Sequence, residues 1–192
     1  MIIAGSGADT IGGAAGADNI TGGAGADQIT GGAGADTITG GAGDDTIVLG
    51  TDTTADTLIF GASAALNGAD TITGFDIASD ILNLDALTTG TTETTIAAGA
   101  LTTTAGVVYQ LGGSAAGNAD TLAAAAAAIT AGATWTTAAV TAYVVLSDDN
   151  STSIYEWVDA GTAGASAAEL TLMGTISSAL TTAQIATAVI LA

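Results

Sequence analysis

The chain has 192 residues, and its 19 acidic side chains are accompanied by no Lys, Arg or His, so the formal net charge is -19. Without basic side chains there is nothing to neutralise phosphate, which excludes nucleic-acid binding and attraction to anionic lipid. A charge of this size needs bound cations, or wide spacing on a wet surface, to offset its self-repulsion. We therefore expect a divalent cation as partner, and neither nucleic acid nor membrane insertion.

The cysteine content and the N-terminus bear on export. The absence of cysteine excludes disulfides and thiolate chemistry. The first ten residues, MIIAGSGADT, contain neither the basic nor the apolar region of a cleavable secretory signal. The longest apolar run, residues 122–129, is too short to span a bilayer. We therefore expect either a cytoplasmic protein or export by a route that reads no N-terminal signal.

A nine-residue repeat occupies residues 4–48. Its clearest copies are GGAGADQIT (22–30), GGAGADTIT (31–39) and GGAGDDTIV (40–48). Two earlier copies keep the aspartate and the isoleucine but lose one glycine each. The recurring aspartates are Asp9, Asp18, Asp27, Asp36 and Asp45, and each is followed two positions later by Ile11, Ile20, Ile29, Ile38 or Ile47. A period held through five copies indicates a solenoid.

Each copy divides into a glycine-rich hexad and a segment of the form x-Ile-x. Glycine tolerates positive φ, so the hexad is expected to be a tight turn, and x-Ile-x a minimal strand whose isoleucine points inward. Two repeats then make one coil of 18 residues, with Ile11, Ile29 and Ile47 in one sheet and Ile20 and Ile38 in the other. This core is small for so much ordered glycine, so a further interaction must join the turns.

The aspartate and the backbone carbonyls of each turn are oxygen ligands suited to calcium. Coiling places Asp9, Asp27 and Asp45 in one stack at roughly 4.8 Å spacing, and Asp18 and Asp36 in another. We expect one ion between each stacked pair of turns, which gives three complete sites; Asp44 or Asp56 could complete half-sites at the ends. The expected ligand set is Asp9, Asp18, Asp27, Asp36 and Asp45, with the turn residues Gly23, Gly25, Gly32, Gly34, Gly41 and Gly43.

The repeat resembles the G-G-x-G-x-D-x-U-x nonapeptide of the RTX family, a calcium-binding parallel β-helix repeat. The resemblance covers residues 4–48, and the departures at Ala4-Gly5 and Gly13-Ala14 predict weaker sites in the first two turns. It implies export by type I secretion through an uncleaved C-terminal signal, and folding on extracellular calcium. Looser likenesses to regions that follow RTX repeats are residues 74–84, residues 170–176 and the uncharged C-terminus.

The remaining sequence predicts a β-rich continuation. The segments ADTL (55–58) and ADTI (69–72) echo the repeat outside its nine-residue register. Strands are expected near 71–76, 80–84, 107–111 and 170–176, a hairpin from 141–146 and 153–158, and a helix over 118–131. Capping-box spacings predict helical turns near 166–169 and 181–184. We predict an all-β fold: a parallel β-roll over residues 1–60, then a β-rich capping, assembly and secretion-signal region over residues 61–192 with one or two short helices.

Three alternative interpretations of individual features were weighed. A solvated acidic face on a metal-free solenoid is disfavoured, because stacked carboxylates without a nearby cation repel one another. The threonines beside the isoleucines could form an ice-binding array, but Asn19, Gln28, Gly12 and Val48 interrupt it. Asp148, Asp149 and Glu156 could suggest glycoside hydrolysis; a hairpin turn explains the two aspartates better. With no His, Lys, Arg or Cys, we expect no enzyme activity.

The leading hypothesis is a secreted calcium-binding structural protein of a cell surface or extracellular matrix, self-assembling as surface-layer (S-layer) proteins do. Its calcium sites, with Ca2+ as cofactor, would make folding dependent on the extracellular medium. One alternative is the calcium-folded secretion module of a larger exported enzyme or toxin. Another is an adhesin or ice-binding module.

Overall fold

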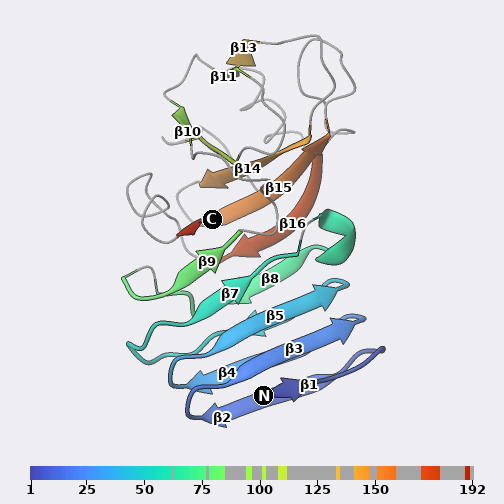
Figure 1. The fold of residues 1–192 in the computed structure, drawn as a ribbon, viewed down its shortest axis with the longest axis vertical. Coiled ribbons are helices and arrows are strands. Elements are labelled where there is room, and N and C mark those ends of the chain that lie inside the picture. The colour runs from blue at the N-terminus through green and yellow to red at the C-terminus, as the bar shows by residue number, and fades with distance from the viewer. Residues whose placement is uncertain are drawn as a thin grey trace.

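A computed structural model shows strands stacked along the long axis of the molecule, with the N-terminal strands at one end and β14, β15 and β16 towards the other (Figure 1). The structure describes residues 1–61, 63–76, 78–84, 94–96, 101–102, 108–111, 133–134, 141–147, 151–158, 170–177 and 189–190. Within these ranges every regular element is a strand apart from one 3-10 helix, η1 (Ala64–Leu66). The expected β-rich architecture is confirmed.

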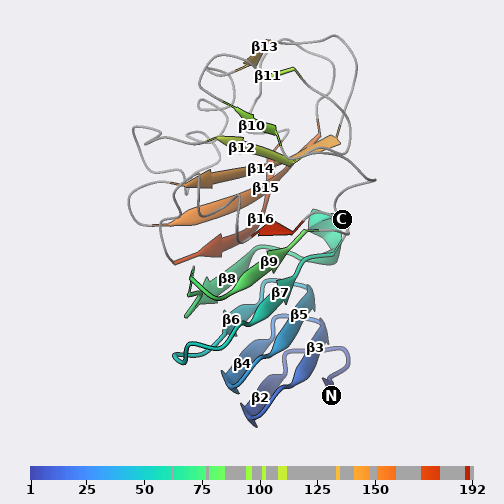
Figure 2. The same ribbon diagram turned by 60° about the vertical axis from the view of Figure 1, so that its left-hand side comes forward.

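The N-terminal half is a roll of two parallel sheets that face each other (Figure 2). One sheet contains, in spatial order, β1 (Ile2–Ile3), β3 (Asn19–Ala24), β5 (Thr37–Ala42), β7 (Thr57–Ile59) and β9 (Ile81–Asn83). The other contains β2 (Thr10–Ala15), β4 (Gln28–Ala33), β6 (Thr46–Val48) and β8 (Asp70–Thr73). The chain therefore alternates between sheets at every strand, as an 18-residue coil requires.

The register confirms the predicted inner columns. Ile11 lies beside Ile29, Ile29 beside Ile47, and Ile47 beside Ile72. In the opposite sheet Ile20 pairs with Ile38, and the column continues through Leu58 and Leu82. Apart from Ile11, the isoleucines of these columns are at most 1% exposed. Both columns extend past the last regular repeat, so the roll does too; the division of the chain at residue 60 stays a prediction.

The strands of the repeat are longer than expected. β2, β3, β4 and β5 each have six residues, and the glycine pair of the repeat lies inside the strand. The prediction of a six-residue turn was wrong, because a glycine without a side chain can lie under the neighbouring turn while its backbone stays extended. At Gly22 an added Cβ would lie 2.5 Å from Asp27 Oδ2, and it would also collide with the Gly40 carbonyl. The true turn is the short Gly-x-Asp segment between strands.

The C-terminal strands extend both sheets of the roll. β14 (Thr141–Ser147), β15 (Thr152–Val158) and β16 (Leu170–Ile176) form an antiparallel ladder, which confirms the predicted hairpin and the strand over 170–176. β16 pairs in parallel with β8, and β17 (Val189–Ile190) pairs in parallel with β9. Beyond β14 lie β12 (Val108–Leu111), which confirms the strand near 107–111, and β10 (Thr94–Ile96). β11 (Leu101–Thr102) and β13 (Ala133–Thr134) pair separately.

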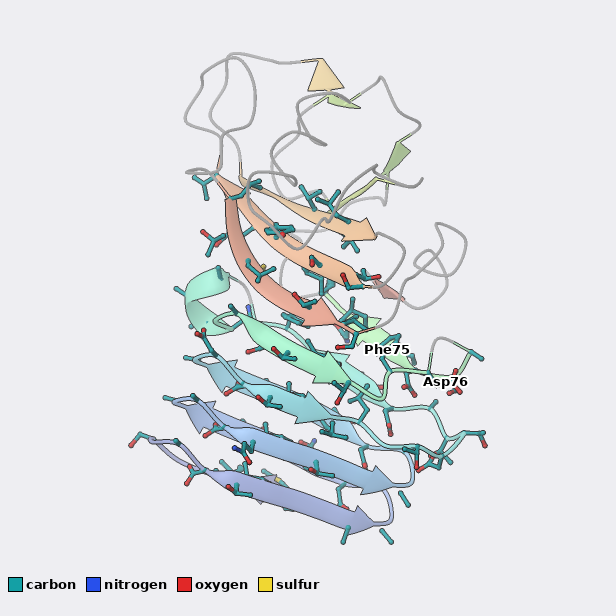
Figure 3. All side chains as sticks on the ribbon, turned by 180° about the vertical axis from the view of Figure 1, so that it is seen from behind. Phe75 and Asp76 are labelled. Atoms are coloured by element: carbon teal, nitrogen blue, oxygen red, sulfur yellow. The ribbon has the colours of Figure 1, made fainter. Side chains whose placement is uncertain are left out.

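One core joins the roll to this sheet. Leu49, Phe60 and Phe75 pack in the same buried cluster as the isoleucine columns and as Ile154 and Met173 of the C-terminal sheet. Phe75 and Asp76 lie in the segment between β8 and β9 (Figure 3). The predicted helix over 118–131 and the helical turns near 166–169 and 181–184 lie outside the described residues.

Replacement of Gly22 tests the close approach inside the strands. Gly22→Ala should lower the stability of the calcium-loaded protein by about 1–3 kcal/mol, the usual cost of overpacking, because the new methyl group meets a backbone carbonyl that cannot move freely. Gly12→Ala is the matched control, since nothing lies within 4 Å of its added Cβ. Urea denaturation followed by circular dichroism measures both; equal midpoints for the two variants would contradict the packing described.

Candidate metal-binding turns

Two columns of aspartates run along the edges of the roll, at the ends of its Gly-x-Asp turns. We call them the Asp27 edge, which contains Asp9, Asp27, Asp45 and Asp70, and the Asp36 edge, which contains Asp18, Asp36, Asp56 and Asp80. The sheets fix this arrangement, because each aspartate immediately precedes a strand whose partner strand lies one coil away.

Hydrogen bonds tie each aspartate to the turn one coil nearer the N-terminus. The Asp9 amide donates to Asp27 Oδ1 at 2.8 Å, and the Asp27 amide donates to Asp45 Oδ1 at 2.8 Å. On the other edge the Asp18 amide donates to Asp36 Oδ1 at 2.9 Å. The predicted stacking at 18-residue intervals is therefore confirmed. The sequence did not indicate that one carboxylate oxygen of each stacked aspartate would accept a main-chain amide.

The second carboxylate oxygen of three aspartates has no partner. Asp27, Asp36 and Asp45 are 1%, 1% and 2% exposed, and the Oδ2 atom of each is buried without a hydrogen bond. Leaving a buried polar atom unsatisfied costs about 1–3 kcal/mol, and more when it is charged. These atoms are the strongest sign that the roll binds a group that satisfies them.

The turn glycines bring backbone carbonyls to the space between coils. Gly23, Gly25, Gly32, Gly34, Gly41 and Gly43 all have φ between 113° and 125°. A Cβ on Gly41 would collide with the Gly23 carbonyl, and one on Gly43 with the Gly25 carbonyl. The carbonyl oxygens of one turn therefore face the turn above it, which is where the sequence placed the expected calcium ligands.

Ala14 occupies one of these glycine positions in the second copy. Its φ is 76°, the only positive value of a non-glycine residue in the part of the chain that the structure describes. The turn thus keeps its shape there at a conformational cost, since such values are unfavourable for residues with a Cβ. This is a physical reason for the weaker first turns expected from the sequence.

Both columns continue past the nine-residue register. The Asp36 amide donates to Asp56 Oδ1 at 2.9 Å across 20 residues, and the Asp45 amide to Asp70 Oδ1 at 3.0 Å across 25 residues. The Asp56 amide donates in turn to Asp80 Oδ1 at 3.0 Å. Asp70 and Asp80 were absent from the predicted ligand set. The A-D-T echoes at residues 55–57 and 69–71 carried the signal for Asp56 and Asp70 once the fixed spacing is ignored.

Burial makes several of these carboxylates resist ionisation. Desolvation raises the pKa of Asp70 from 3.8 to about 8, and the neighbouring charges of Asp45 and Asp44 add to the rise. Desolvation also raises the pKa of Asp45, Asp56 and Asp80. The exposed Asp52 differs, because hydrogen bonds from the Thr54 hydroxyl and amide lower its pKa. No basic side chain exists anywhere in the chain to offset the buried charges.

The donor set fits a hard cation bound by mixed oxygens. Within the described residues no three acidic side chains come together as a metal-binding cluster. An ion at these turns would therefore take backbone carbonyls as well as carboxylates, a mixture that calcium accepts in its six to eight oxygen ligands. The orphaned oxygens of Asp27, Asp36 and Asp45 and the carbonyls of the turn glycines meet that requirement.

A parallel β-roll with stacked Gly-x-Asp turns along both edges defines a solenoid of the calcium-binding class. Residues 1–29 and 21–53 match the family model of the RTX calcium-binding nonapeptide repeat, in 4 copies. This part of the chain is an RTX repeat array, its repeats are calcium-binding, and the resemblance drawn from the sequence is confirmed.

Comparison with solved structures gives two similar repeat modules. One is the solution structure of the AlgE6R2 subunit from the Azotobacter vinelandii mannuronan C5-epimerase, with a TM-score of 0.52 and 22% identity over 99% of this chain and 91% of that chain. The other is the AlgE6R3 subunit from the same epimerase, with a TM-score of 0.49 and 23% identity over 97% and 80%. The former supports the fold alone. No match was found among curated proteins, and none of the helices in the described ranges could cross a membrane.

The metal-free protein should lose stability as pH rises. Because the folded-state pKa of Asp70 is raised to about 8, its contribution is fully present below about pH 4 and is lost as pH rises through 8. The loss is on the order of 5 kcal/mol for this group, and Asp45, Asp56 and Asp80 act in the same direction. Circular dichroism in EDTA should therefore show more β-structure at pH 4.5 than at pH 8, and a loss on acidification would contradict the shift. Excess calcium should restore the roll at pH 8.

Removal of one aspartate should affect as many ions as it has neighbouring turns. Asp27 lies between the turns of Asp9 and Asp45, whereas Asp9 has only the Asp27 turn beside it in its column. Asp27→Ala should therefore weaken two calcium sites and Asp9→Ala only one. Equilibrium dialysis with calcium measures the ions bound per chain, and equal losses in the two variants would argue against sites between stacked turns.

Proposed function

We propose that this protein is a secreted calcium-binding structural protein of a cell surface or extracellular matrix, and that its roll folds when calcium binds. The observation that carries the proposal is the set of buried, unpartnered Oδ2 atoms on Asp27, Asp36 and Asp45 in a chain without a single basic side chain. A chain of this composition has no cation of its own with which to stabilise them. The medium must supply it.

The proposed sites lie between successive turns on each edge. On the Asp27 edge, Asp9, Asp27 and Asp45 would hold calcium together with carbonyls of Gly23, Gly25, Gly41 and Gly43. On the Asp36 edge, Asp18 and Asp36 would act with carbonyls of Gly32 and Gly34. When bound, calcium supplies the positive charge that the stacked carboxylates lack, while their Oδ1 atoms continue to accept main-chain amides.

Dependence on calcium suits a protein that works outside the cell. Extracellular calcium-binding modules have dissociation constants of about 10⁻⁴–10⁻³ M, so their sites fill in the medium and remain largely empty in the cytosol. The chain would then pass through a type I secretion channel unfolded and fold on the outer side. Stacked carboxylates that repel one another before calcium binds are the physical basis of that order of events.

Self-assembly is supported by the open N-terminal end of the roll. β1 and β2 are the terminal strands of their sheets, and neither has a partner on its outer side within the described residues. Met1 and Ile3 are 83% and 63% exposed at this end. Unpaired strand edges readily pair with another chain, and neutralisation by calcium would remove the charge repulsion between copies. We therefore propose a homo-oligomer or polymer formed in calcium, without catalytic activity.

The rival function is a calcium-folded module of a larger exported enzyme or toxin. The observation that favours it is the likeness of fold to repeat subunits of an epimerase. Under this alternative the open strands β1 and β2 would stack on further coils of the same polypeptide. The isolated chain would then fold in calcium and remain monomeric.

A calcium titration separates these outcomes. Circular dichroism should show β-structure appearing as calcium reaches the millimolar range and disappearing when EDTA is added. Light scattering on the same samples should rise with calcium if copies assemble. A β-sheet signal insensitive to EDTA would overturn the folding proposal, and monomeric scattering at millimolar calcium would favour the module of a larger protein.

A further inference from the structure

A sixth turn of the repeat lies outside the matched residues. The segment GADTIT occurs at 34–39 within the repeat array and again, letter for letter, at 68–73. The family model stops at residue 53. The second copy follows Asp45 on the Asp27 edge after 25 residues in place of 18, so the nine-residue spacing conceals it.

The additional residues leave the coil without disturbing the register. They include η1, which precedes Asn67, a residue that is only 3% exposed. The Asn67 side chain accepts the Gly61 amide at 2.6 Å and donates to the Gly61 carbonyl at 3.0 Å. This pair of bonds closes the inserted loop, and the chain re-enters the roll at Gly68.

From Gly68 onward the geometry is that of a regular turn. The Asp45 amide donates to Asp70 Oδ1 at 3.0 Å, as the Asp27 amide does to Asp45 Oδ1 at 2.8 Å. The Thr71 amide donates to the Asp45 carbonyl at 2.8 Å, and the Thr46 amide to the Asp27 carbonyl at the same 2.8 Å. The strand that follows, β8, continues the isoleucine column through Ile72.

The glycine of this turn faces the carbonyl below it. Gly68 has a φ of 82°, and an added Cβ there would collide with the Gly43 carbonyl. In the regular array a Cβ on Gly43 would collide with the Gly25 carbonyl in the same way. The close approach that directs carbonyl oxygens into the space between turns is therefore repeated between Gly43 and Gly68.

An unsatisfied oxygen belongs to the same pair of turns. Asp45 is 2% exposed, and its Oδ2 atom is buried without a partner. Asp44 adds a second carboxylate to the lower turn, where the other four copies have alanine, and its Oδ1 accepts the Ala69 amide at 2.9 Å. The pair of turns thus has more negative charge than any regular pair.

We propose that the turns at residues 43–45 and 68–70 together form a further calcium site on the Asp27 edge, beyond the recognisable repeats. Asp45 and Asp70 provide carboxylate oxygens, Gly43 provides a carbonyl, and Asp44 strengthens the local negative field. The inference rests on the proposed calcium-dependent role of the roll and extends its ladder of sites by one.

The Asp36 edge does not gain a comparable site. Asp80 is also 4% exposed and also accepts the amide of an aspartate one coil below, but both its oxygens are satisfied by the protein. The Asp56 amide donates to Oδ1 at 3.0 Å and the Asp76 amide to Oδ2 at 2.7 Å. Asp80 therefore acts as a hydrogen-bond acceptor for two amides, which makes it the matched control for Asp70.

The test counts calcium ions in three proteins. Asp70→Asn keeps an oxygen to accept the Asp45 amide while removing the charge, and Asp80→Asn makes the same change at equal burial. Isothermal titration calorimetry, with native mass spectrometry as an independent count, should show one ion fewer in Asp70→Asn and the wild-type number in Asp80→Asn. An unchanged count in Asp70→Asn, or an equal loss in both variants, would overturn the proposal. Wild-type protein that binds no calcium would overturn the proposed function itself.

A second variant protects the test against misfolding. Asp44 is exposed, so Asp44→Asn should fold even if Asp70→Asn does not. It should keep the wild-type number of ions and weaken the affinity of one of them by a few-fold, because the local negative charge falls by one. Unaltered affinities throughout the Asp44→Asn titration would contradict a site between these turns.

Discussion

The fold depends on stacked carboxylates that the chain cannot neutralise by itself. The geometry of the roll puts Asp27, Asp36 and Asp45 at nearly complete burial, and the sequence provides no Lys, Arg or His to accompany them. Carboxylates in such positions either take up protons or bind a cation. The short isoleucine columns and the glycine-rich strands add too little burial to override that penalty. Metal binding and folding are therefore one event in this half of the molecule.

Each stacked aspartate has two separate tasks, one for each oxygen. Oδ1 accepts a main-chain amide from the coil below and fixes the stacking, whereas Oδ2 is left for an ion. Asparagine would preserve the first task and lose the second, because its amide nitrogen donates where an acceptor is required. Glutamate would carry its carboxylate one methylene further, into the inward face of a strand that already leaves room only for glycine at Gly22 and Gly31. The residue type is fixed by both constraints together.

Much of the roll could be predicted from the sequence because its information is local and periodic. The alternation of sheets, the inner columns of isoleucine and the aspartate stacks all follow from nine-residue spacing. The strand length could not be predicted, since the glycine pair looks like a turn until the neighbouring aspartate is placed above it. The continuation to Asp70 and Asp80 was missed because inserted residues break the period while the hydrogen bonds restore it. The parallel pairing of β16 with β8 joins segments about a hundred residues apart, and neither carries a local signal for the other.

The direction of the aspartate-to-amide bonds has a consequence for how the roll comes apart. Every Oδ1 acceptor reaches towards the coil nearer the N-terminus, so each coil is held mainly by its immediate neighbours, as in a one-dimensional zipper. At the C-terminal end the zipper is clamped by β16, which pairs with β8, and by Glu156, whose carboxylate accepts the Ala64 amide at 3.0 Å. The opposite end has no clamp within the described residues. Fraying therefore starts at β1 and β2 and proceeds coil by coil, so amide hydrogen-exchange protection rises steadily from Asp9 towards Asp70.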